Sequence, residues 1–182
     1  MHTHWWRSSF MLRAMYFVTF RQMSKHLGQL DKWLAAAGEL AETKKFDAGN
    51  FMTLRLAPDQ FAFARQVQTA CDTAKLAASR LSGKDAPTFA DTEQTMDELR
   101  TRIGAVRGWL ETLGESDFDA AATRVITQPR WEGKVMTGAD YFIEHAVPNF
   151  FFHLSHAYAI LRHAGVSLGK RDFLGPLTQR MP

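Results

Sequence analysis

The chain has 182 residues, of which 46% are apolar and 23% charged, with a formal net charge of +3 and a single cysteine. This length favours one domain with a sizeable core, and basic residues spread among acidic ones argue against a nucleic-acid surface. No apolar run is long enough for a transmembrane helix, and the lone Cys71 excludes an internal disulfide, so we expect a cytoplasmic protein.

The first 14 residues stand apart from the rest of the chain. They contain His2, His4 and two arginines but no acidic residue, and Met15 begins the first regular helical pattern. We expect residues 1–14 to form a disordered N-terminal extension, because termini are usually loosely held, and residues 15–182 to form a single domain. Loose metal binding at His2 and His4 is the less favoured alternative.

Three amphipathic helices follow, each indicated by apolar residues three and four positions apart. The first covers residues 16–43, the second runs from Pro58 to Leu81, and the third follows a capping-box-like start at Asp91. The third has the most regular pattern, which is typical of helix bundles. Its apolar residues are Met96, Leu99, Ile103, Val106, Leu110 and Leu113.

A short β-rich stretch precedes the last helix. Residues 125–127 and 134–136 are rich in β-formers and flank a turn with Pro129 and Gly133, which predicts a small β-hairpin. The last helix begins at a cap of Thr137 with Asp140, and its apolar arc is broad enough for contact with several neighbours. Pro148 lies within this helix, so we expect a kink near residues 144–146.

No motif in the chain identifies a reaction. The sequence lacks G-x-S-x-G, C-x-x-C and a glycine-rich phosphate loop after a strand. His145 and His156 are roughly 16 Å apart along a helix and cannot share a metal ion. His153 and His156 are spaced closely enough to do so, but a third ligand, such as His26, must come from another helix. Cys71 adjoins Asp72, whose charge disfavours a reactive thiolate.

Polar residues on two helices suggest a binding site. Arg65, Gln68 and Asp72 share one side of the second helix, where a solvated edge is the more conservative interpretation. The alternative is a polar cluster that faces a pocket, together with polar residues on one flank of the last helix. The candidate ligand-binding residues are therefore Arg65, Gln68, Asp72, His145, Asn149 and His156.

Several segments resemble a known family. APDQFAFARQVQTACD, PNFFFH, AYAILRHAGV and LGKRDFLG resemble an uncharacterised bacterial domain-of-unknown-function family of the DinB/YfiT-like superfamily, across about residues 15–175. The resemblance implies a four-helix bundle in up-down-down-up order, with a long crossover between helices two and three. Many superfamily members hold a metal with one His from helix two and two His four residues apart in the last helix.

This chain departs from that metal triad at every position. Its second helix contains no His, and the residues four positions after His145 and His153 are Asn149 and Ala157. We therefore assign no metal ligand and no cofactor, because a shared fold does not transfer chemistry.

The sequence as a whole predicts an all-α, DinB-like four-helix bundle with a small β-hairpin before the last helix. We expect it to bind a small ligand or a protein partner, and to form a homodimer through a helical face, without binding nucleic acid or membrane. The alternative is a metal-dependent transferase or hydrolase with a rearranged site at His26, His153 and His156. Whether the protein is an enzyme stays open.

Overall fold

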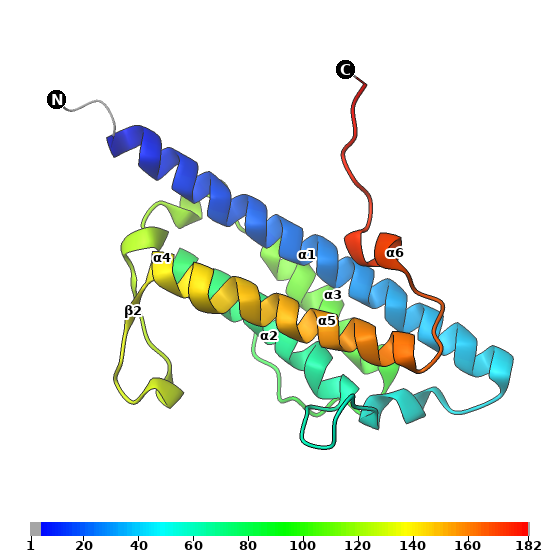
Figure 1. Ribbon diagram of the computed structural model, residues 1–182. Helices are drawn as coiled ribbons and strands as arrows, with labels where there is room; N and C mark the ends of the chain where they lie inside the picture. The colour runs from blue at the N-terminus through cyan, green and yellow to red at the C-terminus, as the bar shows by residue number, and fades with distance from the viewer. Residues whose placement is uncertain (1–4, 182) are drawn as a thin grey trace.

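Four long helices form the body of the structure, a computed structural model that describes residues 5–181 and the side chains of residues 11–181 (Figure 1). The expected all-α fold is confirmed. The long helices are α1 (Trp5–Lys44), α2 (Phe63–Ser82), α3 (Met96–Glu111) and α5 (Val147–His163). The shorter elements are β1 (Val125–Ile126), β2 (Met136–Thr137), α4 (Gly138–Asp140), a π-helix (Tyr141–Ala146) and α6 (Lys170–Leu174). Four 3-10 helices cover Ala48–Thr53, Glu115–Phe118, Ala121–Thr123 and Pro129–Trp131.

Contacts between α1 and α3 show that these helices are antiparallel. Arg100, early in α3, forms an ion pair with Asp31 at 2.8 Å. Arg107, two turns later in α3, donates a hydrogen bond to the carbonyl oxygen of Ser24, which lies earlier in α1. The two helices therefore run in opposite directions.

The pair α2 and α5 is antiparallel by the same criterion. Asn149 donates to the hydroxyl of Thr73 at 2.7 Å, whereas the later His153 pairs with the earlier Gln66 at 2.8 Å. Helices α2 and α3 both end near the hairpin, so residues 83–95 cross back along the bundle between them. The order is up-down-down-up, as predicted.

The C-terminal segment closes one side of the core. The rings of Trp33 and Phe173 stack at 5.6 Å, and Tyr158 packs edge-on against Phe173. The indole nitrogen of Trp33 donates to the backbone oxygen of Asp172 at 3.2 Å, which satisfies the polar atom of a fully buried ring. Helix α6 is thus a strap across α1 and α5.

Helix α1 continues into the stretch that we expected to be a disordered extension. The helix begins at Trp5, and His2 and His4 lie outside the described residues. Arg13 pairs with Glu115 at 3.1 Å and with Asp119 at 2.9 Å. These ion pairs tie the helix at Arg13 to the segment after α3.

Two helix starts lie later than the sequence suggests. Helix α2 starts at Phe63 and not at Pro58. Pro58 lies in a turn before the helix, where its carbonyl oxygen accepts a hydrogen bond from Arg55. The capping box of α3 is formed by Thr95 and Glu98, with each side chain bonded to the other's backbone N–H.

The hairpin and the start of the last helix follow the prediction closely. Strands β1 and β2 pair in antiparallel register, and the hydroxyl of Thr137 accepts from the backbone N–H of Asp140 at 3.1 Å. The π-helix lies just before Pro148, where a helix irregularity was expected. None of the helices in the described part of the chain combines the length and apolar character needed to cross a membrane.

Candidate functional site

A small cavity of about 110 Å³ lies between α2, the π-helix with the start of α5, and the hairpin turn. We call it the hairpin pocket. All but one of its lining residues have a polar side-chain group, and they come from segments that are far apart in sequence. The lining residues are Thr69, Asp72, Thr73, Leu76, Arg80, Gln128, Arg130, Tyr141, His145 and Asn149.

The π-helix supplies the aromatic wall of this pocket. Tyr141 and His145 both lie on it, and their rings stack at 5.3 Å with an interplanar angle of 17°. Trp131, from the hairpin turn, packs edge-on against both rings. Single π-helical turns within α-helices are frequent at functional sites, because they turn side chains away from the regular helical register.

Two arginines fix the hydrogen-bonding state of this wall. Arg80 donates to the hydroxyl of Tyr141 at 2.9 Å, and Arg130 donates to Nε2 of His145 at 2.6 Å. Because Nε2 accepts, the proton of a neutral ring is on Nδ1. Burial lowers the pKa of His145, and the charges of Arg130 and Arg80 lower it further. The imidazole is therefore neutral near pH 7.

Two residues that line the pocket have a buried hydrogen-bond donor without a partner in the described part of the chain. Nδ1 of His145 and Nε2 of Gln128 are buried and have no hydrogen-bond partner among the described residues. Asp72 is the one acid in the lining, and its Oδ1 already accepts from Arg102 at 2.6 Å and forms an ion pair with Lys75 at 3.2 Å. Unpartnered buried donors beside two guanidinium groups favour an anionic ligand.

Arg65 and Gln68 belong to a different group, which we call the Arg102 cluster: Arg102, Asp72, Asp91, Glu93, Arg65 and Gln68. Arg102 is 2% exposed and lies 2.6, 2.7 and 2.8 Å from oxygens of Asp72, Asp91 and Glu93. Arg65 pairs with Asp91 at 2.6 Å, and Gln68 donates to Glu93 at 2.8 Å. The cluster joins α2, α3 and the crossover, and its charged groups are paired with one another, although Nε of Arg102 has no hydrogen-bond partner among the described residues.

The histidines of the alternative metal site have separate partners. His153 pairs with Gln66 through Nδ1, and burial lowers its pKa to about 4. Nδ1 of His156 bonds to the carbonyl oxygen of Phe152, and His26 lies edge-on to Phe151 on the side of α6. Within the described residues, no three His, Cys, Asp or Glu side chains are grouped so that they could hold a metal ion.

The single thiol of the chain, on Cys71, is also a poor candidate for a nucleophile. Cys71 is fully buried on α2, and burial raises its pKa to about 12. The charge of Asp72 also raises the pKa of Cys71, as predicted, but its effect is smaller than that of burial. A thiol this weakly acidic is not a nucleophile at neutral pH.

Of the six candidate residues, the structure brings Asp72, His145 and Asn149 together in the hairpin pocket. Arg65 and Gln68 face the crossover instead. His156 lies further along α5, where its Nε2 is 3.2 Å from the amide nitrogen of Gln60.

Sequence reasoning missed Arg80, Gln128, Arg130 and Tyr141. Arg80 lies two turns beyond Asp72 on the same side of α2, so extending the polar stripe of Arg65, Gln68 and Asp72 would have included it. Gln128 and Arg130 come from the hairpin turn, where no helical periodicity shows which way side chains point.

Comparison with known proteins agrees with this fold. A family model described as "Domain of unknown function (DUF1993)" matches residues 15–174. Among solved structures, the chain is similar to the crystal structure of a DinB family member protein from Shewanella denitrificans, with 46% sequence identity and a TM-score of 0.91. That match covers 95% of this chain and 99% of the other. No curated protein matches. The resemblance seen in the sequence is confirmed.

Proposed function

The chain belongs to the DUF1993 family, a domain of unknown function with a DinB-like bundle, and from this premise we propose that it binds a small anion in the hairpin pocket. The observation that carries the proposal is the set of donors around His145. Two guanidinium groups and the two buried donors of His145 and Gln128 lie at or around a cavity whose one acid is already paired.

The size of the pocket limits the class of ligand. A volume of about 110 Å³ is equivalent to three or four water molecules at roughly 30 Å³ each. Pockets for drug-sized ligands measure about 300–1,000 Å³. A carboxylate or a phosphate group fits this space, either as a free ion or as the head group of a larger molecule that extends through the opening.

The same residues disfavour a metal cation. Arg80 and Arg130 place two positive charges beside His145, the one imidazole in the lining, and like charges at this range repel a metal ion. The described residues also lack a third grouped ligand. An anion-binding role therefore accounts for the geometry better than a metal-dependent transferase or hydrolase. A cytoplasmic location stays a prediction.

Titration of the purified protein with inorganic phosphate, acetate and succinate at constant ionic strength tests the proposal. We expect at least one of these anions to raise the melting temperature in a saturable way, because ligands that bind the folded state stabilise it. In Arg130→Gln the affinity should fall about 10-fold or more, since a hydrogen bond to a charged group contributes about 1.5–3 kcal/mol.

Arg130→Gln is the informative variant because its one hydrogen bond among the described side chains is to His145, so the fold should be retained. Arg171→Gln is the matched control. It removes the same charge from an exposed position on α6 and should leave the affinity unchanged. Absence of saturable binding for all three anions, or equal weakening in both variants, would contradict the proposal.

A further inference from the structure

The outer face of α1 carries a regular stripe, which begins with Arg21, a donor to the backbone oxygens of Glu111 and Leu113 at the end of α3. Its residues recur at alternating spacings of four and three, which keeps them on one side of a helix. The stripe consists of Arg21, Lys25, Gly28, Lys32, Ala35, Glu39 and Glu42. It is polar where a coiled-coil seam would be apolar, and its charge changes from positive to negative about halfway along.

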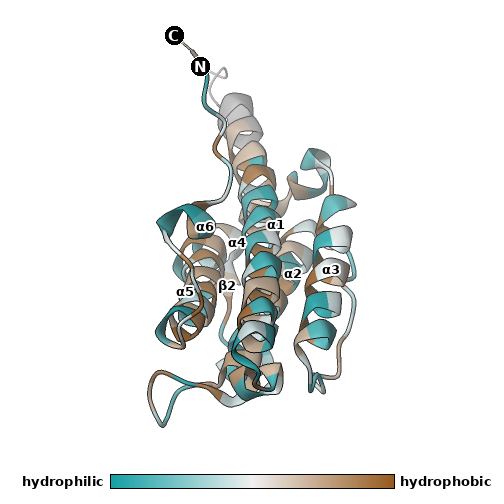
Figure 2. Cartoon of the chain, turned by 90° about the vertical axis from the view of Figure 1, so that its right-hand side faces the viewer, coloured by the Kyte–Doolittle hydropathy of each residue, from teal (hydrophilic) through white to brown (hydrophobic). Residues whose placement is uncertain are grey.

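A groove accompanies this stripe along the side of α3. Three hollows of about 420, 370 and 580 Å³ follow one another from Arg21 to Glu42. Neighbouring hollows share lining residues: Arg107 lines the first and the second, and Arg100 lines the second and the third. These two arginines bond to Asp31 and Ser24 of α1, so they separate the hollows, which together span roughly 30 Å at the helical rise. Figure 2 looks onto this face, with α1 in the middle and α3 beside it.

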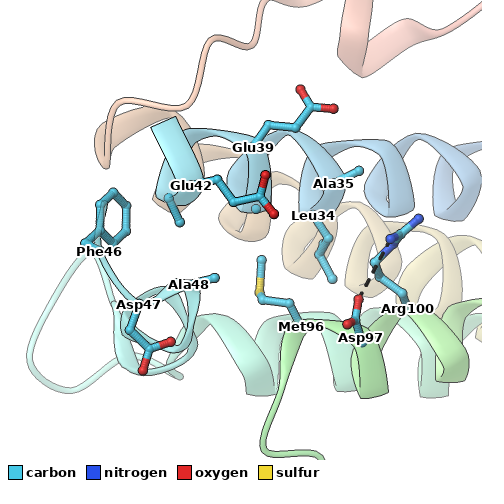
Figure 3. A pocket seen from close by; sticks show the side chains of 12 residues that line it. Leu34, Ala35, Glu39, Glu42, Phe46, Asp47, Ala48, Met96, Asp97 and Arg100 are labelled. Carbon is cyan, nitrogen blue, oxygen red and sulfur yellow. Dashed lines mark ion pairs between the residues drawn. The ribbon is translucent and has the colours of Figure 1, made fainter. Parts of the chain in front are cut away.

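The two ends of the groove have opposite charge. The hollow near Arg21 is also lined by Lys25, Lys32 and Arg107, with two acidic residues, Asp31 and Glu111. The hollow at the other end is lined by Glu39, Glu42, Asp47 and Asp97 with one arginine, Arg100, as Figure 3 shows. Within the described part of the chain, Lys25, Lys32, Glu39 and Glu42 form no ion pair.

Glycines leave the backbone open along the groove. A Cβ atom built at Gly38 of α1 or at Gly104 of α3, which both line the hollows, would meet no atom within 4 Å. Another helix can therefore approach closely at these points, as small residues allow wherever helices pack tightly.

We propose that this face binds a second copy of the chain in antiparallel orientation, about a two-fold axis near the middle of the stripe. A two-fold contact brings each surface patch against the same face of the other copy. In the antiparallel arrangement the basic half, with Lys25, meets the acidic half, with Glu39 and Glu42, twice. A parallel arrangement would place like charges together. The charge pattern of α1 thus selects both the partner and its orientation.

Two charge-reversal variants test this arrangement. Lys25→Glu with Lys32→Glu makes the stripe largely acidic, and Glu39→Lys with Glu42→Lys makes it basic. Wild-type protein should have twice the 20.6 kDa mass of one chain by light scattering at about 0.1 M salt, and dissociate towards one chain at about 1 M salt, where the Debye length falls to about 3 Å. Each variant alone should be monomeric, because its two contact zones repel.

The decisive sample is the equimolar mixture of the two variants. The acidic stripe of one should pair with the basic stripe of the other, so the mixture should regain the dimer mass. A control with Lys134→Glu and Lys170→Glu changes the charge equally at exposed positions outside the groove and should stay dimeric. A wild-type protein that is monomeric at low salt, or a mixture that stays monomeric while both variants keep their helical circular dichroism, would overturn the proposal.

Discussion

The Arg102 cluster and the hairpin pocket lie on neighbouring sides of α2 and share Asp72, but their arginines have different partners. Arg102 is buried with three carboxylates within 2.8 Å. Arg80 and Arg130 bond to a phenol and an imidazole, with buried donors left over in the same region. The difference teaches that an arginine paired with carboxylates of the same chain stabilises the fold, whereas arginines without a carboxylate partner among the described residues can bind an anion from solution.

Removing the cation of the Arg102 cluster should have the largest effect on stability. Arg102→Met leaves Glu93 without a cation and leaves Asp72 and Asp91 with only Lys75 and Arg65, and breaking a buried ion pair on one side costs about 3–5 kcal/mol. We expect that loss in the free energy of unfolding measured by urea denaturation. Arg100→Met on the same helix is the control, because Arg100 forms part-exposed ion pairs that contribute about 1 kcal/mol or less. Equal losses in both variants would contradict a structural role for the cluster.

A smaller effect should come from His153, a buried histidine whose partner is neutral. Its pKa of about 4 lies below the usual 6.5, so the folded state resists protonation more than the unfolded chain. Stability is therefore complete above pH 6.5 and is lost as the pH falls towards 4, by about 3 kcal/mol from this group.

Unfolding curves recorded across this pH range would measure that loss. In His153→Gln the dependence between pH 6.5 and 4 should flatten, because the titrating group is gone. The same change at the exposed His163 should leave the slope of the wild type. If His153→Gln keeps the full slope, another group causes it.

The smallest change in the free energy of unfolding is expected at Arg80, so this residue contrasts most clearly with Arg102. Arg80→Gln removes a cation that has no carboxylate partner, so without added anion the free energy of unfolding should change by about 1 kcal/mol or less. Its cost should instead appear as loss of the melting-temperature shift caused by phosphate, acetate or succinate. A loss as large as that of Arg102→Met would mean that Arg80 is structural too.

The fold was predictable from sequence to a larger degree than the site. Helical spacing and capping residues such as Thr137 and Gly83 identify the four long helices, because these signals are local. The pocket depends on long-range contacts: Arg130 reaches His145 from a hairpin turn that has no periodicity. Arg65 and Asp72 do share a side of α2, but the crossover residues Asp91 and Glu93, which decide their partners, carry no signal of where they dock.

The burial of Cys71 gives the chain an internal probe of its own opening. The thiol is fully buried in the core, so an alkylating reagent can reach it only when α2 separates from its neighbours. The rate of modification thus measures how often the bundle opens, at one site and without any added label. A bound anion that holds α2 against the hairpin would slow that modification, so the alkylation rate of Cys71 would also report on ligand binding.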